Sequence, residues 1–171
     1  MTIRSSIEQA TKSVMGAINP SEESNDLLET LETEHDEVQD LLKELSESES
    51  AAEQKALLAK VKQALIPHTK AEETVLYDRI AALKGEKAKV AGAEGYTEHA
   101  LASATLAQLD KLEANSPQFK ADAKVLKELV NHHIKEEEGT MFSQARENFS
   151  AEQREQMNRE FLATKKTIPV S

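Results

Sequence analysis

The chain has 171 residues and no cysteine. Without thiols it can have no disulfide bonds, thiolate zinc sites, iron–sulfur clusters or thiol nucleophiles. Any metal ion must therefore be held by nitrogen or oxygen ligands. The length fits one domain, and it allows a helical bundle to bury a sizeable core.

Basic residues are in the minority, because 21 Lys and Arg stand against 31 Asp and Glu and the net charge is -10 at pH 7. Proteins that bind nucleic acid usually present a basic surface to the phosphates, so we expect no nucleic-acid partner. No apolar run approaches the roughly 18 residues that cross a bilayer, and no secretory signal is visible. We therefore predict a soluble, cytoplasmic protein with no membrane partner.

Residues that disfavour helices are scarce, with 5 Gly and 4 Pro. Ala, Leu, Glu, Lys and Gln dominate, and these residues lose least on entering a helix. The few breakers divide the chain into helical segments. We predict an all-α fold, an up-down-up-down antiparallel four-helix bundle over 24–147. A leading helix or arm over 1–20 and a short C-terminal helix with a tail over 151–171 flank this bundle. The leading segment is compatible with an arm, a partner-binding helix or a lid.

In the four long segments the apolar positions recur in steps of three and four, the spacing that forms a seam between nearly antiparallel helices. Each apolar stripe also contains polar residues of a type that binds metals. In chain order they are His35 in the first segment, His68 and Glu72 in the second, His99 in the third, and His133 and Glu137 in the fourth. We expect these six side chains to point into an otherwise aliphatic core.

The chain also looks duplicated. The tripeptide Thr-Glu-His at 33–35 recurs 64 residues later at 97–99. The pattern His-x-Lys-x-Glu-Glu at 68–73 recurs 65 residues later at 133–138. Two copies of a helix hairpin therefore each supply a lone His and a His-x-x-x-Glu-Glu motif.

Taken singly, each of these motifs is more often structural than functional, because a Glu four residues after a His is common by chance in an acidic chain. Together they are a different case, since each buried charge without a partner costs several kcal/mol. The stripes contain no Arg that could pair with Glu72 or Glu137. A bound cation is the simplest compensation.

The residue types indicate which cation. Ca²⁺ and Mg²⁺ prefer oxygen ligands, and structural zinc sites prefer closed tetrahedra with thiolates. Four imidazoles and two carboxylates suit a pair of iron or manganese ions bridged by the carboxylates. The ferritin-like di-iron bundle uses lone Glu residues and Glu-x-x-His pairs, whereas here the order is inverted.

This ordered set, over 35–142, resembles the hemerythrin-like family, the HHE cation-binding domains. The resemblance implies two iron ions with an oxo or hydroxo bridge, for which Mn or Zn are possible substitutes. By this resemblance His35 and His68 hold one iron, His99 and His133 hold the other, and Glu72 and Glu137 bridge the two.

The resemblance also implies a function. The favoured interpretation is a non-haem di-iron protein that binds or senses oxygen or a related small molecule, diatomic or peroxide, or that holds iron. The alternative is a di-iron enzyme that acts on peroxide, oxygen or nitric oxide. A third interpretation is a metal-free helical interaction protein. The sequence does not indicate an oligomeric state.

The chain departs from the respiratory oxygen carriers of this family at two positions. Those carriers have a second histidine four residues after the one on the third helix, where this chain has Ser103. Their last carboxylate is an Asp one position later, where this chain has Glu138 behind Glu137. Tyr96 is a candidate for the place of the missing histidine, although an aromatic residue that caps the bundle is the simpler interpretation.

Several neighbours of the six residues are not expected to be ligands. Glu34 and Glu98 precede a histidine by one residue and so lie about 100° away on an ideal helix. Glu73 and Glu138 are expected behind the ligands or on the solvent side. The repeat also contains two aromatic residues at equivalent positions, Tyr77 and Phe142. We expect both to be core residues below the metal pocket.

One register ambiguity remains in the fourth segment, because His132 and His133 are adjacent and each has a Glu four residues later. The apolar stripe alone supports either choice. The duplication favours His133, since only that alignment also matches Lys70 with Lys135. We therefore predict that His133 faces the core.

Overall fold

The computed structural model describes residues 26–170. Within this range it contains helices and no strand, so the predicted all-α class is confirmed. The predicted leading segment over 1–20 lies outside the described residues. The elements are α1 (Leu27–Glu47), α2 (Ala51–Glu72), η1 (Glu73–Tyr77), α3 (Asp78–Ala81), α4 (Glu86–Leu109), α5 (Pro117–Glu136), η2 (Glu137–Met141), α6 (Phe142–Asn148) and α7 (Ala151–Lys165).

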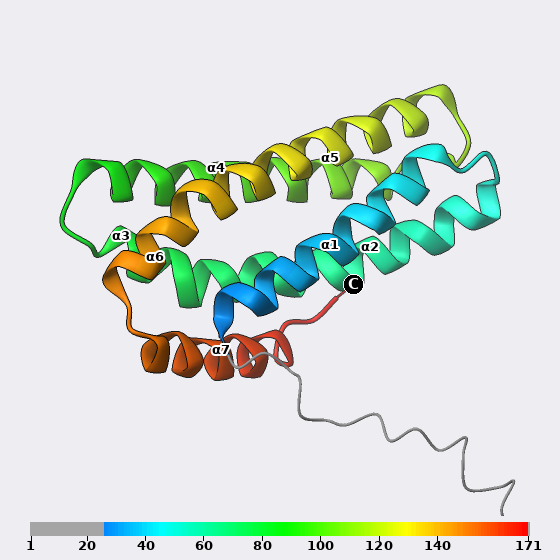
Figure 1. Ribbon diagram of the computed structural model, residues 1–171. Helices are drawn as coiled ribbons and strands as arrows, with labels where there is room; N and C mark the ends of the chain where they lie inside the picture. The colour runs from blue at the N-terminus through cyan, green and yellow to red at the C-terminus, as the bar shows by residue number, and fades with distance from the viewer. Residues whose placement is uncertain (1–25, 171) are drawn as a thin grey trace, which may run out of the picture.

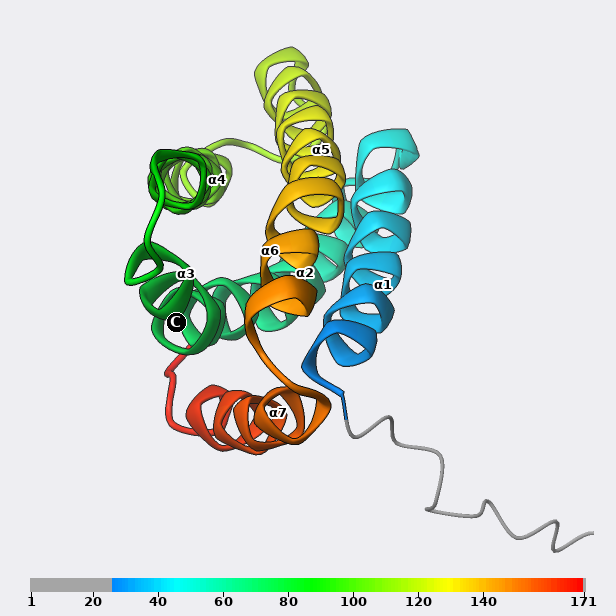
Figure 2. The same ribbon diagram turned by 60° about the vertical axis from the view of Figure 1, so that its left-hand side comes forward.

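The four long helices are α1, α2, α4 and α5, and each contacts two of the others. Helix α1 contacts α2 and α5, and α4 contacts α5 and α2. The last helix, α7, contacts α1, α2 and η1. Figures 1 and 2 both place α7 on the side of α1 and α2, away from α4. No helix of residues 26–170 has the length and apolar character to cross a bilayer.

Side-chain caps fix where the helices begin. The carboxylate of Asp26 accepts a hydrogen bond from the Leu28 backbone N–H at 2.9 Å, which starts α1. Ser50, Ser116 and Ser150 cap α2, α5 and α7 in the same way, each at the residue before the helix. Such caps satisfy backbone N–H groups that have no partner inside the helix.

Two π-helical segments, η1 and η2, interrupt the long helical runs at equivalent places in the two halves. In η1 the Asp78 backbone N–H donates to the Glu73 carbonyl, and in η2 the Phe142 N–H donates to the Glu137 carbonyl. Each bond spans five residues instead of four, so each segment inserts one residue into a turn. The side chains that follow are thereby rotated relative to an uninterrupted α-helix.

The core consists of two apolar clusters. One is near α7 and includes Leu31, Tyr77 and Phe161, and the other is near the opposite ends of the long helices and includes Leu42 and Leu126. Along each long helix the predicted polar residues fall at the boundary between the clusters. Aliphatic packing therefore closes the site at both ends.

Gly95 of α4 generates a stability prediction. A Cβ at this position would lie 2.6 Å from Cε2 of Tyr77 and 2.8 Å from Cε of Met141. Gly95→Ala should therefore destabilise the protein by about 1–3 kcal/mol through overpacking.

Gly92→Ala is the matched control, because its Cβ would make an ordinary 3.7 Å contact with Cβ of Ala81. It should be neutral or stabilising by up to about 1 kcal/mol, since Ala favours a helix more than Gly does. Urea denaturation of the two variants measures both effects. Equal midpoints would contradict the tight approach of Tyr77 to α4.

Candidate metal centre

The structure places all six predicted side chains inside the protein, where none is more than 7% exposed. They come from all four long helical runs. The members of this cluster are His35 on α1, His68 and Glu72 on α2, His99 on α4, His133 on α5 and Glu137 at the start of η2.

Each of the two glutamates lies between one histidine of each half. Oε2 of Glu72 is 3.3 Å from Nε2 of His68 and 3.5 Å from Nε2 of His99. Oε2 of Glu137 is 3.3 Å from Nε2 of His35 and 3.6 Å from Nε2 of His133. This is the arrangement in which a carboxylate can be shared by two metal ions.

Two groups of these side chains could each hold an ion, and they share Glu72. The first group adds His35 and His68, and the second adds His99 and His133. Within each group the candidate ligand atoms all lie within 4.8 Å of one another. The division of the histidines into two pairs is the one that the resemblance to the hemerythrin-like family implies.

Each histidine of the cluster donates its outer Nδ1–H to a second carboxylate. The pairs are His35–Glu138 at 2.9 Å, His68–Glu34 at 2.9 Å, His99–Glu73 at 3.2 Å and His133–Glu98 at 2.7 Å. A proton held on Nδ1 leaves the Nε2 lone pair free and directed inward, which is the state that binds a metal.

Two of these outer carboxylates had no predicted role. Glu34 and Glu98 lie outside the cluster, as expected, but each orients a histidine of the neighbouring helix. The sequence did contain a signal, because the Glu before the lone His is repeated in both halves. That repetition could have indicated a function in both copies.

The polar atoms at the centre of the cluster are poorly satisfied by the protein itself. Nε2 of His35 and both carboxylate oxygens of Glu72 and of Glu137 are buried and accept or donate no hydrogen bond. Leaving such groups without partners is costly. Cations between the imidazoles and the carboxylates would satisfy all of these atoms, so the donor set fits a pair of metal ions.

The pKa values of the metal-free cluster reflect the short distances between its imidazoles and carboxylates. Burial lowers the pKa of His68, but the charge of Glu72 and the hydrogen bond and charge of Glu34 outweigh this effect and raise the pKa to about 10. Burial raises the pKa of Glu72, but the histidines around it, His68 first, hold that pKa well below its usual range. In the metal-free protein the imidazole of His68 therefore carries a proton that a metal ion would have to displace.

Tyr77 is a residue of the site that the sequence analysis missed. Its hydroxyl lies 3.3 Å from Nε2 of His99 and 3.3 Å from Nε2 of His133. Its ring stacks on His99 with the centroids 5.0 Å apart. Burial, followed by the charges of Glu137 and Glu72, raises the pKa of this phenol well above its usual value.

The π-helical segment explains the miss. Tyr77 follows Glu72 by five residues, which is about 140° away on an ideal α-helix but close to one full turn in a π-helical segment. Phe142 is the counterpart of Tyr77 in the other half and stacks on His35, with the ring centroids 6.1 Å apart. At this pair of equivalent positions the two halves of the site therefore differ by one hydroxyl.

The structure places Tyr96 and Ser103, the two residues discussed with the missing histidine, outside the cluster. The Tyr96 hydroxyl donates to Oδ1 of Asp78 at 2.6 Å, outside the cluster. Ser103 is exposed.

The structure also places the two adjacent histidines of α5. His133 is buried and faces the cluster, whereas the side chain of His132 is 60% exposed. Nε2 of His132 lies 3.5 Å from Oε1 of Glu98, on the outer side of that carboxylate. This register is the one that the duplication favoured.

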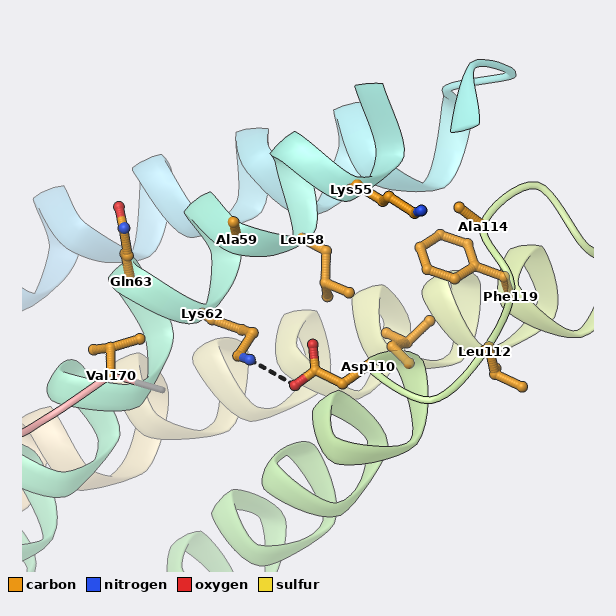
Figure 3. Close-up of a pocket in the computed structure, with 11 residues that line it drawn as sticks. Lys55, Leu58, Ala59, Lys62, Gln63, Asp110, Leu112, Ala114, Phe119 and Val170 are labelled. Atoms are coloured by element: carbon orange, nitrogen blue, oxygen red, sulfur yellow. Dashed lines mark hydrogen bonds and ion pairs between the residues drawn. The ribbon is translucent and has the colours of Figure 1, made fainter. Parts of the chain in front are cut away.

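A separate groove of about 350 Å³ lies at the far end of α2. Figure 3 shows Leu58 and Phe119 on its apolar wall and the ion pair of Lys62 with Asp110 across it. The residues that line it include no histidine and one carboxylate. It therefore offers no second metal centre.

The comparison with known families agrees with this geometry. A family model for the Hemerythrin HHE cation binding domain matches residues 26–145. The match spans more than half of the chain and contains every residue of the cluster. The chain therefore belongs to the hemerythrin HHE cation-binding domain family.

One curated relative is a protein of Nostoc sp. (strain PCC 7120) named DNA nickase. It is 29% identical over 168 residues, which cover 97% of this chain and 47% of the relative. The chain thus spans less than half the length of this relative. No solved structure matches the chain.

The register of α5 leads to a paired prediction. His133→Ala removes an imidazole from the cluster and should reduce the metal content to half or less. His132→Ala removes an exposed side chain and should leave the metal content unchanged. Metal per chain, measured on both purified variants, checks this, and the reverse pattern would move the site to His132 and Glu136.

The raised pKa of His68 leads to a prediction about pH. A pKa of about 10 means that the imidazole is protonated at neutral pH in the metal-free protein. Metal binding must release this proton, so affinity should increase as pH rises, by up to about tenfold per pH unit for each proton released. Competition titration with Co²⁺ and a chelator at pH 6 and pH 8 measures the change. Equal affinities would mean that no proton is displaced.

Proposed function

We propose that this chain is a non-haem di-iron protein that binds or senses oxygen or a related small molecule, or that holds iron. The observation that carries the proposal is the set of buried oxygen and nitrogen atoms of Glu72, Glu137 and His35 that have no hydrogen-bond partner in the protein. Two iron ions between the histidine pairs would satisfy them. When bound, the ions supply coordination positions and redox chemistry towards a small diatomic or peroxide ligand.

In this proposal His35 and His68 hold one ion, His99 and His133 hold the other, and Glu72 and Glu137 bridge them. The four outer carboxylates orient the imidazoles and strengthen them as donors. The four long helices act as an antiparallel up-down-up-down bundle that keeps these side chains fixed and dry. Mn or Zn could replace iron in this donor set, and a cytoplasmic location is consistent with the proposal.

The activity in the name of the Nostoc relative is not part of this proposal. Every residue of the cluster is at most 7% exposed, so a nucleic-acid backbone has no path to the candidate metal positions. The net charge of -10 also opposes binding of a polyanion. The chain matches only part of the relative, and the proposal does not concern the unmatched part.

A second candidate function is supported by Tyr77. Reduction of peroxide to water consumes two electrons and two protons. The electrons would come from two bound ferrous ions that become ferric. The Tyr77 hydroxyl, 3.3 Å from two imidazoles, would supply one proton and solvent water the other. Its raised pKa keeps the phenol protonated in the metal-free protein at neutral pH. A di-iron enzyme that acts on peroxide, oxygen or nitric oxide is therefore the alternative.

Metal analysis of the purified protein followed by two assays tests the proposal. We expect about two irons per chain. A reversible optical change on cycles of oxygen addition and removal would support binding, whereas many peroxide turnovers per chain without loss of iron would support the enzyme. Tyr77→Phe should slow turnover in the second case and preserve iron content. Absence of any bound transition metal after reconstitution with Fe²⁺ would overturn both functions.

A further inference from the structure

A small hollow of about 20 Å³ reaches the cluster from outside, between α4 and the junction of α5 with η2. We call it the inlet. It is lined by Ala91, Glu94, Gly95, Glu98, His133, Glu136, Glu137, Thr140 and Met141. A volume of this size admits about one water-sized body at a time. Two of the lining residues, His133 and Glu137, belong to the cluster itself.

The inlet lies in the second half of the duplicated chain, and comparison with the first half shows which side chains leave it open. At the positions equivalent to Ala91 and Gly95 it has two leucines, Leu27 and Leu31, and both are fully buried. The position equivalent to Thr140 is a buried valine. The side of the cluster with the inlet therefore has small side chains. The equivalent side in the first half is filled by bulky aliphatic side chains.

The same comparison applies to charge. The positions equivalent to Glu94 and Glu136 in the first half are Thr30 and Ala71, which are uncharged. Glu94 is exposed and Glu136 is half-buried, so both carboxylates are accessible at the mouth of the inlet. Glu94 and Glu136 are thus acidic residues of the open side that have no acidic counterpart in the first half.

Helix α7 closes the opposite side. Phe161 is fully buried and meets the ring of His68 edge-on, with the centroids 5.8 Å apart. Nζ of Lys165 lies 2.5 Å from Oε2 of Glu34, the carboxylate behind His68. A cation that approached from this side would meet aromatic packing and a fixed positive charge.

The charges of the inlet have the opposite sign. Four of its nine lining residues are glutamates and none is Lys or Arg. The ion pairs of Glu98 are with two imidazoles, those of His133 and His132. At the inner end, Glu137 is 1% exposed and neither of its carboxylate oxygens has a hydrogen-bond partner. Carboxylates therefore line the inlet from its mouth to Glu137, whose oxygens have no hydrogen-bond partner.

We propose that the inlet is the route by which divalent cations reach the metal centre, with Glu94 and Glu136 attracting the ion and Glu137 receiving it. This inference rests on the proposed metal centre. Negatively charged channels raise the local concentration of cations and their rate of association. The position formed by His99 and His133 is the first that such an ion meets.

Uptake of Co²⁺ by the metal-free protein tests the inlet, followed by the visible absorption of the bound ion in a stopped-flow instrument. The double variant Glu94→Gln, Glu136→Gln should take up Co²⁺ about threefold to tenfold more slowly at low salt. Its final stoichiometry should equal that of the unaltered protein. The difference should shrink in 0.5 M NaCl, where charges are screened within a few ångströms.

Glu37→Gln, Glu44→Gln is the matched control, because it removes two exposed charges from α1, which does not line the inlet. It should leave the rate within twofold of the unaltered protein. An equal slowing by both double variants would mean that only net charge matters, and would overturn the inlet.

A second pair of variants changes the bulk of the inlet wall without changing its charge. It tests the route independently of electrostatic attraction. Thr140→Leu adds bulk to the wall of the inlet and should slow uptake, whereas Thr140→Val keeps the shape and should not. Unchanged rates in Thr140→Leu and in the Glu94, Glu136 variant would overturn the inlet while the metal centre stands. If the unaltered protein binds no Co²⁺ at equilibrium, the metal centre itself is wrong and the inlet fails with it.

Discussion

The structure depends on one constraint, which is that six ionisable side chains are buried together without enough partners of their own. Each histidine satisfies its outer nitrogen with a carboxylate, for example His133 with Glu98 at 2.7 Å. The inner atoms have no such solution, and the carboxylates of Glu72 and Glu137 remain without hydrogen bonds. Burial of this kind is expensive unless opposite charge is supplied. The apolar clusters on both sides offer these atoms no polar partner, so a cation is the natural complement.

Much of this could be predicted from the sequence, because the relevant signals are periodic. The three- and four-residue steps that place His35 and His68 among leucines identify both the helices and their inner faces. The repeat at 64 and 65 residues adds a test that does not depend on the helical wheel, and it resolved the choice between His132 and His133. Features that follow from a regular helix were accessible in this way.

The remaining features depend on departures from regularity or on tertiary contacts. The side chain of Tyr77 reaches the cluster because the π-helical segment turns it inward. No residue pattern in the sequence predicts such a segment. The pairing of Glu34 with His68 joins two helices, so its partner could not be read from either helix alone. The side on which α7 docks is likewise set by packing of residues such as Phe161. Local patterns carry no information about these long-range choices.

The division of the donors between the two halves has a consequence for how the protein holds together. One half of the chain contributes His35, His68 and Glu72, yet Glu72 also faces His99 of the other half at 3.5 Å. Glu137 makes the reverse connection to His35 at 3.3 Å. The first hairpin contains one complete group, but the second group takes its Glu72 from the first hairpin, so the two groups occur together only at the common face of the hairpins. An ion bound there would act as a cross-link between two half-proteins that the backbone joins through a short loop, and its binding energy would hold the two hairpins together.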